Sequence, residues 1–195
     1  GLLQDENSPG EVLDLTAHVL VFPPESEADP YIVLPRFWIP EDNLHQRVHT
    51  DRVPYDQWVK MGYIMATPGN VIDYEWIFAD IDADAKDYDL IEVAFDRWGA
   101  ARVVNVLQER GLTMVEFGQG FASMSPPMRE LERLIRSHRI EHGNNPVLKW
   151  MADNLVANED PAGNIKPDKA KSIERIDGMV ALIMSLDRAM RHGGD

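Results

Sequence analysis

Residues 89–117 constrain the fold more than any other part of the sequence. The run DLIEVAF at 89–95 is almost continuously apolar, which is typical of a strand buried on both faces of a sheet. Residues 97–111 then place apolar side chains at helical spacing and end at a glycine, and LTMVEF at 112–117 predicts another strand. A strand, a helix and a strand within about thirty residues predict a parallel βαβ unit with a right-handed crossover.

The segments on either side extend this unit into one α/β domain over residues 1–195, with 1–11 as an irregular or artificial N-terminal end. Pro35 predicts that an early strand lies at a sheet edge or contains a bulge, because proline cannot donate a backbone hydrogen bond. The polar segment 158–172 is predicted to be an ordered loop. We predict strands at 12–22, 31–40 and 63–68, and helices at 41–49, 54–62, 78–85, 126–138, 145–155 and 172–192.

Composition excludes several classes of protein. The 195 residues include no cysteine, which rules out disulfides, thiolate catalysis and cysteine-ligated zinc and fits a reducing cytoplasm. No apolar run reaches about 18 residues, so a membrane span is excluded, and the N-terminus lacks the pattern of a signal peptide. A net charge of −14 argues against a free-standing nucleic-acid binder, although metal-binding carboxylates also contribute negative charge. The first residue is Gly rather than Met, which predicts an artificial end or a fragment of a longer chain.

Two aspartates occupy positions that suggest chemistry. Asp96 follows the apolar strand directly, at the carboxyl end of a central strand, where α/β folds place their sites. Asp177 precedes Gly178 in the predicted final helix, beside an apolar stripe, and a glycine there lets something approach the backbone closely. Asp96 can instead cap the following helix. Asp177 can instead be a boundary residue that pairs with Arg175 or Lys171.

Carboxylates from two distant segments that meet at a sheet end are the smallest cage for Mg²⁺ or Mn²⁺, which prefer oxygen ligands. Two such ions about 3.5–4 Å apart can activate a water molecule and stabilise the leaving oxygen of a phosphodiester. The pattern therefore indicates either metal-dependent hydrolysis or two ordinary structural aspartates, and spacing alone leaves both interpretations open.

Eight stretches of the sequence carry a family resemblance: DLTAHVLVF, FWIPEDNLHQRV, VPYDQWVKMGYIMATPGNVIDY, VAFDRWGA, FGQGFASMSPPMRELERLI, HGNNPVLKWMADN, DPAGNIKPDKAKS and RIDGMVALIMSLDRA. Together they resemble the C-terminal nuclease domain of the large terminase subunit of tailed bacteriophages, in the HK97-like family. They run in family order from about Asp14 to Ala189 and cover nearly the whole chain. The resemblance implies a ribonuclease H-like fold, with a mixed, mostly parallel sheet flanked by helices and an acidic two-metal centre.

The resemblance also implies the site residues. Asp96 in VAFDRWGA matches the family's second catalytic acid, and Asp177 in RIDGMVA matches its third. The first acid normally lies on a GLDLS-like strand before DLTA, and residues 1–13 contain no such strand. Asp5 and Asp14 are imperfect substitutes, of which Asp14 has the better strand context. With Asp14 as the third ligand, the implied cofactor is a pair of Mg²⁺ or Mn²⁺ ions.

Polar residues outside the acid set have two interpretations each. The basic cluster near Asp177 either contacts the DNA backbone or belongs to a solvated loop; it consists of Lys166, Lys169, Lys171 and Arg175. Asp73 and the segment HGNN at 142–145 are further candidates for the cleft, with helix capping and turn formation as their structural interpretation.

The resemblance implies an endonuclease that cuts concatemeric viral DNA during packaging, in the cytoplasm of an infected bacterium. Its implied partners are double-stranded DNA, the terminase small subunit, the portal protein and the ATPase domain of a full-length chain, with no membrane. The sequence has no phosphate-binding GxxxxGK[ST] motif, so that ATPase domain is expected to be absent from this chain. The alternatives are a catalytically silent docking module of the packaging motor, or another ribonuclease H-like enzyme such as a resolvase or integrase.

Overall fold

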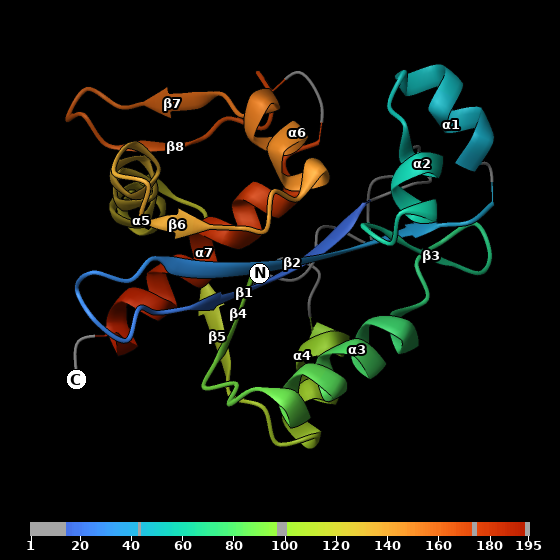
Figure 1. Ribbon diagram of the computed structural model, residues 1–195, viewed down its shortest axis with the longest axis horizontal. Coiled ribbons are helices and arrows are strands. Elements are labelled where there is room, and N and C mark those ends of the chain that lie inside the picture. The colour runs from blue at the N-terminus through green and yellow to red at the C-terminus, as the bar shows by residue number, and fades with distance from the viewer. Residues whose placement is uncertain (1–14, 43, 97–100, 173–174, 194–195) are drawn as a thin grey trace.

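A four-stranded sheet forms the centre of the computed structural model, which describes residues 15–42, 44–96, 101–172 and 175–193 (Figure 1). Its strands are β1 (Thr16–Phe22), β2 (Tyr31–Pro40), β3 (Met65–Thr67) and β6 (Ile140–Glu141). β1 pairs with β2 in continuous antiparallel register. β3 and β6 pair in parallel with β2, so the sheet is mixed, as predicted.

Pro35 lies in the middle of β2, which is a central strand and not the predicted edge or bulged strand. The register with β1 is unbroken and places Pro35 opposite Val19. Along the other edge of β2, pairing with β6 ends at Ile32 and pairing with β3 begins at Trp38. Between these two points β2 has no second strand neighbour among the described residues, so the missing backbone donor of proline is tolerated there.

The predicted βαβ unit is confirmed. It consists of β4 (Val93–Asp96), α4 (Ala101–Glu109) and β5 (Met114–Phe117), and the two strands pair in parallel. β4 is shorter than the predicted strand 89–95, because β5 begins opposite Val93 and the residues before it have no strand partner in the described part of the chain. The pairing continues to Asp96, at the carboxyl end of the strand.

Helices cover both faces of the central sheet (Figure 1). Side chains of β2 alternate between two buried clusters: Phe37 and Ile39 belong to the first and Trp38 to the second. The first cluster also receives side chains from α2 (Tyr55–Lys60), α5 (Phe121–Arg136), α6 (Pro146–Asn154) and α7 (Asp177–His192). The second receives them from α3 (Tyr74–Asp87) and α4. α1 (Leu44–Asp51) lies beside α2, at the β3 end of the molecule.

Residues 158–172 form more regular structure than the predicted loop. β7 (Ala157–Glu159) and β8 (Ile165–Pro167) pair as an antiparallel hairpin. The Asp160 carboxylate accepts the backbone N–H groups of Ala162 and Asn164, both at 2.9 Å, and Gly163 has a φ of +83°. The loop prediction is wrong, because this hairpin has no alternation of apolar residues that would indicate strands. The Asp160 side chain specifies the turn instead, by accepting backbone N–H groups.

The final helix begins at Asp177 rather than at the predicted residue 172. The predicted apolar stripe is confirmed at Val180, Ile183 and Leu186, which are all buried. Among the helices that the structure describes, none has the length and apolar character needed to cross a membrane.

Candidate metal centre at the ends of β4 and α7

Asp96 is the last residue of β4, and only 8% of it is exposed. It pairs opposite Phe117 in the β4–β5 ladder, so the strand fixes its backbone. The residues between Asp96 and Ala101, on which the helix-capping alternative depends, lie outside the described residues. A carboxylate this deeply buried requires a charged or polar partner, because an isolated buried charge is costly.

Asp177 is the first residue of α7, directly after Ile176 at the N-cap position. The prediction that Asp177 lies one turn inside the helix is wrong, because the helix starts five residues later than the apolar pattern indicates. At this position its carboxylate lies at the positive end of the helix dipole, which stabilises negative charge. Asp177 is half-buried, so it lies at the boundary between core and solvent.

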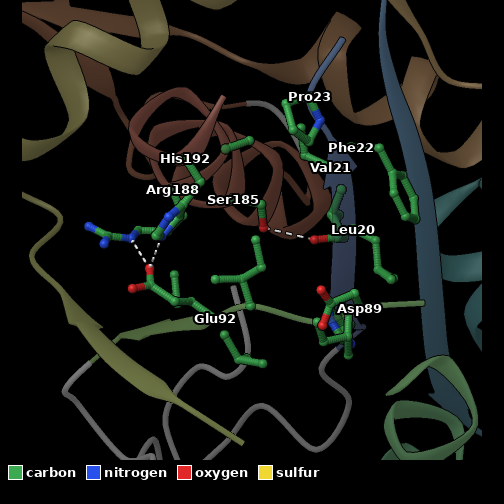
Figure 2. Close-up of a pocket in the computed structure, with 16 residues that line it drawn as sticks. Leu20, Val21, Phe22, Pro23, Asp89, Glu92, Ser185, Arg188 and His192 are labelled. Atoms are coloured by element: carbon green, nitrogen blue, oxygen red, sulfur yellow. Dashed lines mark hydrogen bonds and ion pairs between the residues drawn. The ribbon is translucent and has the colours of Figure 1, made fainter. Parts of the chain in front are cut away.

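α7 runs antiparallel to β4, because Arg188 contacts Glu92 at one end and the charges of Asp177 and Asp96 both act on Lys169 at the other. Arg188 Nε donates to Glu92 Oε2 at 2.6 Å, which places the last turns of α7 beside the start of β4 (Figure 2). From Arg188 back to Asp177 the helix covers roughly 16 Å, and from Glu92 to Asp96 the chain covers roughly 13 Å. The two lengths are similar, so Asp177 returns to the level of Asp96.

Lys169 connects the two acids. The pKa of its ammonium is lowered chiefly because burial disfavours the charged form, whereas the charges of Asp177 and Asp96 act in the opposite direction. Lys169 is exposed when the whole residue is considered, so the desolvation concerns the ammonium end of its side chain. Both carboxylates thus lie within electrostatic reach of one cation, which indicates that Asp96 and Asp177 share a site.

The other three predicted DNA contacts have different surroundings. Lys166 Nζ lies 5.0 Å from the ring centroid of Phe121. Lys171 Nζ lies 3.4 Å from Asp168 Oδ2, and 69% of the lysine side chain is exposed. Arg175 is half-buried just before α7. None of these contacts identifies a DNA surface by itself, so that role stays a prediction.

The third predicted acid, Asp14, lies outside the described residues, as does Asp5. Within the described ranges, no group of three or more His, Cys, Asp or Glu side chains is placed to hold a metal ion. The described part of the site therefore supplies two carboxylates. Their oxygen atoms are the donor type that Mg²⁺ and Mn²⁺ prefer, so the donor chemistry fits a hard divalent ion.

Asp73 and Asn145 have structural roles, as their alternative interpretation predicts. Asp73 is the N-cap of α3, where its carboxylate accepts the backbone N–H of Glu75 at 3.0 Å. Asn145 is the N-cap of α6, and its side-chain oxygen accepts the N–H groups of Val147 and Leu148, both at 3.0 Å. Both side chains satisfy donors that the first turn of a helix leaves unpaired.

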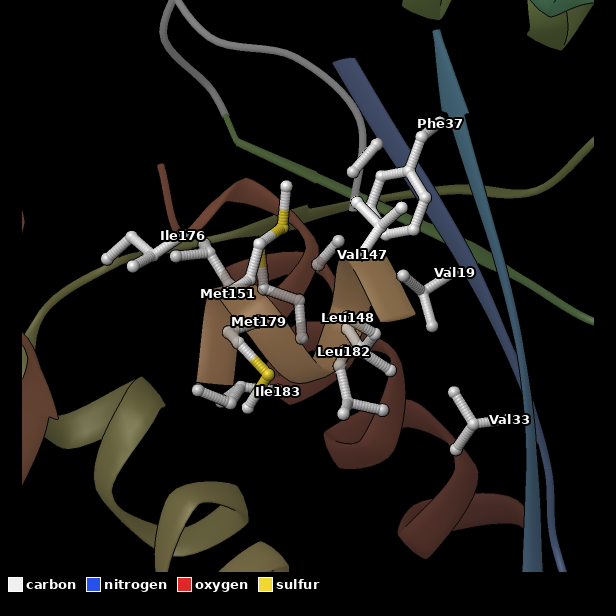
Figure 3. Packing of buried hydrophobic residues seen from close by; sticks show 14 of the residues in the cluster. Val19, Val33, Phe37, Val147, Leu148, Met151, Ile176, Met179, Leu182 and Ile183 are labelled. Carbon is white, nitrogen blue, oxygen red and sulfur yellow. The ribbon is translucent and has the colours of Figure 1, made fainter. Parts of the chain in front are cut away.

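Gly178 allows a close approach to the backbone, as predicted. The groups that approach it are side chains of this protein. A Cβ atom at this position would lie 2.7 Å from Phe37 Cε1 and 2.8 Å from Met151 Sδ. Figure 3 shows both side chains in the packed region around the start of α7, together with Ile176. The glycine therefore lets α7 begin against β2 and α6, which holds the neighbouring Asp177 in place.

A second charged cluster lies at the opposite end of β4 and α7, and the sequence analysis does not predict it. Besides its bond from Arg188, Glu92 Oε2 lies 3.2 Å from His192 Nε2 (Figure 2). The hydrogen bond from Arg188 is the largest cause of the lowered pKa of the Glu92 carboxyl. The two basic residues are four positions apart on one helix face. Their acidic partner is 96 residues from Arg188, so no local pattern could reveal the cluster.

The arrangement first defines a class of protein. A mixed sheet with helices on both faces, a parallel βαβ unit, and aspartates at a strand end and at the start of the last helix form a ribonuclease H-like α/β fold. The fold class predicted from the sequence is therefore confirmed.

The chain belongs to the family of terminase large-subunit endonuclease domains. Its sequence matches the family described as "Terminase large subunit, endonuclease domain" over residues 10–193. It is 44% identical over 188 residues to the large terminase subunit of Enterobacteria phage HK97, a match that covers 93% of this chain. It is 36% identical over 166 residues to protein YmfN of Escherichia coli strain K12, which covers 82%.

A solved structure agrees with this assignment. The crystal structure of the HK97 bacteriophage large terminase matches with a TM-score of 0.80 and 45% sequence identity, over 90% of this chain and 36% of that one. The chain spans little more than a third of the curated relatives it matches, 37% of the HK97 subunit and 36% of YmfN. The activity and partners of those whole proteins therefore enter only as proposals for this chain.

Proposed function

We propose that this chain is a metal-dependent DNA endonuclease domain that cuts concatemeric viral DNA during genome packaging. Membership of the terminase nuclease family supports a packaging-related nuclease role. The observation that carries the specific proposal is the convergence of Asp96 and Asp177 on the ammonium of Lys169, at the end of a parallel strand. Two-metal phosphodiester hydrolysis uses oxygen ligands to hold the ions, and a cation nearby can contact the phosphate; the proposed site has both kinds of group.

Asp96 and Asp177 are the proposed metal ligands, with Asp14 as the proposed third. Two Mg²⁺ or Mn²⁺ ions at such a site would supply an activated water and stabilise the leaving oxygen. The fold contributes by fixing the two carboxylates, Asp96 through the β4–β5 ladder and Asp177 through the first turn of α7. Each carboxylate thus has a defined position before substrate binds, so little ordering is required at that step.

The proposed DNA contacts are Lys166, Lys169, Lys171 and Arg175. Lys169 lies beside both acids, so we assign it to the phosphate nearest the cut. Contacts from such residues to phosphate position the DNA without reading its sequence. Because the chain carries a net charge of −14, we expect the domain alone to bind DNA weakly and with strong salt dependence.

Weak intrinsic binding implies that other components deliver the DNA. We propose that residues 1–195 act as the nuclease domain of a longer large subunit, whose ATPase domain would hold the DNA near the acids. The terminase small subunit and the portal protein are the further proposed partners. The proposed location is the cytoplasm of the infected bacterium. The relatives' length supports this view, since this chain corresponds to 37% of the HK97 subunit.

A second candidate is a catalytically silent docking module of the same motor. One observation favours it: in the described ranges only two carboxylates converge, and no group of three potential ligands is placed to hold a metal. With fewer ligands, metal affinity falls and cutting slows. Under this proposal the fold would serve to contact the portal or the small subunit.

Plasmid cleavage separates the two candidates. The purified chain is incubated with supercoiled plasmid and Mn²⁺ or Mg²⁺, in parallel with Asp96→Asn, Asp177→Asn and Asp14→Asn. Glu92→Gln is the matched control, because Glu92 is also an acid beside β4 but lies at the opposite end. The nuclease proposal predicts cutting by the parent and the control and almost none by the first two variants.

The other outcomes are equally informative. Equal cutting by all variants would contradict the assignment of Asp96 and Asp177. No cutting by the parent, together with measurable binding to a portal or small-subunit protein, would support the docking module. Loss of cutting in Asp14→Asn would assign the third ligand, and unchanged cutting would remove Asp14 from the site.

A further inference from the structure

Exposed apolar side chains are concentrated in one short stretch of the chain. In the described ranges ten large apolar side chains are well exposed, and half of them lie within sixteen residues: Met61, Tyr63, Met65, Val71 and Trp76. A single exposed apolar side chain is ordinary, whereas a group of them marks an interaction site. Met, Tyr and Trp are also among the residue types that are enriched at protein interfaces.

Strand pairing places Met65 on the face of the sheet that α3 covers. Met65 lies opposite Trp38 in the parallel pairing of β3 with β2, and opposite residues of paired strands point to the same face. Trp38 belongs to the buried cluster that receives side chains from α3. Its Nε1 donates to Asp80 Oδ2 at 2.9 Å, which fixes α3 over this part of β2. Met65 therefore lies between the open side of the sheet and α3.

The contacts of α3 bring Trp76 to the same place. Arg36 Nε donates to Asp84 Oδ2 at 2.6 Å, so the partners of α3 move back along β2 from Trp38 to Arg36 as the helix advances from Asp80 to Asp84. α3 therefore runs antiparallel to β2. Trp76 is one turn before Asp80 in the same row of the helix, because residues four apart lie on one face. This position is beyond Trp38, at the end of β3.

The loop between β3 and α3 completes the surface. The backbone N–H of Asp73 donates to Thr67 Oγ1 at 3.5 Å, so the start of α3 lies beside the end of β3 (Figure 1). Val71 lies in this closed loop and is 63% exposed. β3 is the last strand on its side of the sheet among the described residues. Met65, Val71 and Trp76 thus form one exposed apolar surface, the β3–α3 surface.

Acidic residues surround the β3–α3 surface. Residues 61–85 contain five carboxylates and no lysine or arginine. Two of the carboxylates pair with arginines of neighbouring elements. Glu75 directly precedes Trp76 in the first turn of α3, and 67% of its side chain is exposed. The apolar surface therefore has a rim with an excess of negative charge.

The sign of this charge restricts what can bind. A carboxylate rim repels the phosphates of nucleic acid and of anionic lipid surfaces. A second copy of the chain would also meet repulsion, because each copy carries a net charge of −14. The complementary occupant is a protein surface with an apolar centre and lysine or arginine around it.

We propose that the β3–α3 surface docks a basic protein partner. The partner places apolar side chains against Met65, Val71 and Trp76, and a lysine or arginine beside Glu75. A large aromatic side chain with a polar rim is the usual arrangement of an interaction hot spot. This docking surface uses none of the residues that we propose for the metal or for DNA, so it does not depend on nuclease activity.

A defined peptide tests the proposal without DNA or metal. An amphipathic helical peptide of leucine and lysine carries a fluorophore, and anisotropy measures its binding to the purified chain at physiological salt. A leucine–glutamate peptide controls for charge, and a serine–lysine peptide controls for apolar contact. We expect the leucine–lysine peptide to bind at least tenfold more tightly than either control.

Matched variants locate the binding. Trp76→Ser should weaken binding of the leucine–lysine peptide at least about tenfold, whereas Ile32→Ser should leave it within about twofold. The two parent residues are 43% and 44% exposed. Glu75→Lys should also weaken binding, and Glu25→Lys, in the exposed turn between β1 and β2, makes the same charge change without this effect. If Trp76→Ser unfolds the protein, Val71→Ser in the exposed loop provides the same test.

Equal losses in Trp76→Ser and Ile32→Ser would overturn the proposal, as would equal binding of the lysine and glutamate peptides. A dimer of the parent that Trp76→Ser dissociates in sedimentation would identify a second copy as the occupant. Binding of a DNA duplex that is lost in Trp76→Ser would identify nucleic acid, and either result would overturn the proposal. A chain that binds the peptide at this surface but does not cut plasmid would contradict only the nuclease proposal, so the two failures are distinguishable.

Discussion

β4 and α7 carry charged clusters at both of their ends, and the two ends differ in how the charge is balanced. At one end Glu92 receives Arg188 Nε at 2.6 Å and lies 3.2 Å from His192 Nε2, so its carboxylate has two basic partners. At the other end the charges of Asp96 and Asp177 both act on the ammonium of Lys169. At the first end one acid has two basic partners, whereas at the second two acids act on the same base.

The difference separates a structural role from a chemical one within the same pair of elements. The ion-paired end fixes α7 antiparallel to β4, which sets the level at which Asp177 meets Asp96. The acid-rich end brings two carboxylates together, and carboxylate oxygens are the ligands that a hard divalent cation prefers. Functional sites commonly reduce stability in this way, and the surrounding fold compensates for it. Substitutions at the two ends should therefore give opposite combinations of activity and stability.

The largest expected effect is on activity at the acid-rich end. Asp96→Asn and Asp177→Asn should each lower the rate of plasmid cleavage by at least about 100-fold, the usual consequence of removing one group that stabilises the transition state. Thermal unfolding temperatures of both variants should stay level or rise, because each change removes one of two like charges at the site. The measurements are nicking rates in Mn²⁺ and calorimetric unfolding of the same preparations.

Glu92→Gln provides the contrast for this prediction. It should leave the cleavage rate within a few-fold of the parent while lowering the unfolding temperature. If the aspartate variants lost stability and activity together, whereas Glu92→Gln lost neither, the division of roles between the two ends would be wrong.

The next effect concerns the packing that positions Asp177. Gly178→Ala should lower the free energy of unfolding by about 1–3 kcal/mol, because the new methyl group would overlap Phe37 and Met151. The helix propensity of alanine offsets this by at most about 1 kcal/mol. Gly118→Ala is the control, since a Cβ there meets Ser123 Oγ at 3.4 Å, an ordinary contact. Urea unfolding measures both, and equal stability of the two variants would contradict the packing argument.

The parts of the fold that could be predicted from the sequence are those with local patterns. The βαβ unit follows from apolar periodicity within one short segment, and Asp96 could be placed because it ends that segment. The start of α7 could not be predicted, since apolar residues continue the helical period before the helix begins. The side chain that packs against Gly178 could not be predicted either, because Phe37 is remote from Gly178 in the sequence.

The sheet and the second charged cluster also depend on contacts between remote residues, which no local sequence pattern predicts. β6 has two residues and becomes a strand only by pairing with β2, so its own sequence carries almost no strand pattern. Pro35 indicates an edge, whereas the actual cause of its tolerance is a gap between two short neighbours of β2. Glu92 and Arg188 are ordinary charged residues in the sequence, and only the tertiary fold brings them together.

A smaller effect concerns the pH dependence of stability at the ion-paired end. The hydrogen bond from Arg188 is the main reason that the pKa of Glu92 lies below its ordinary value of 4.5. Because the folded pKa is lowered, the stabilisation is complete above about 4.5 and disappears as the pH falls through the lowered value. Glu92, whose side chain is 16% exposed, should contribute about 1.5 kcal/mol at pH 7, which Glu92→Gln removes.

Urea unfolding of the parent and of Glu92→Gln at several pH values measures this contribution. The two free energies of unfolding should differ at pH 7 and converge as the pH falls through the lowered pKa of Glu92. A difference that stayed constant over this range would show that the Glu92 contact stabilises the protein by packing rather than by charge.

The smallest expected effect is at Lys171, which tests whether proximity to the acids matters. Its ion pair with Asp168 has an N–O distance of 3.4 Å, and 69% of its side chain is exposed. Exposed pairs contribute little, so Lys171→Ala should shift the unfolding temperature by less than about 2 °C. Removal of one phosphate contact should reduce the slope of log K for DNA binding against log salt concentration by about one unit, and it should reduce the cleavage rate only slightly.

Lys169→Ala should reduce cleavage more strongly, because it removes the cation beside Asp96 and Asp177. Equal losses from the two lysine variants would show that cations act only through general attraction of DNA, and that the charge balance at the acid-rich end has no specific role.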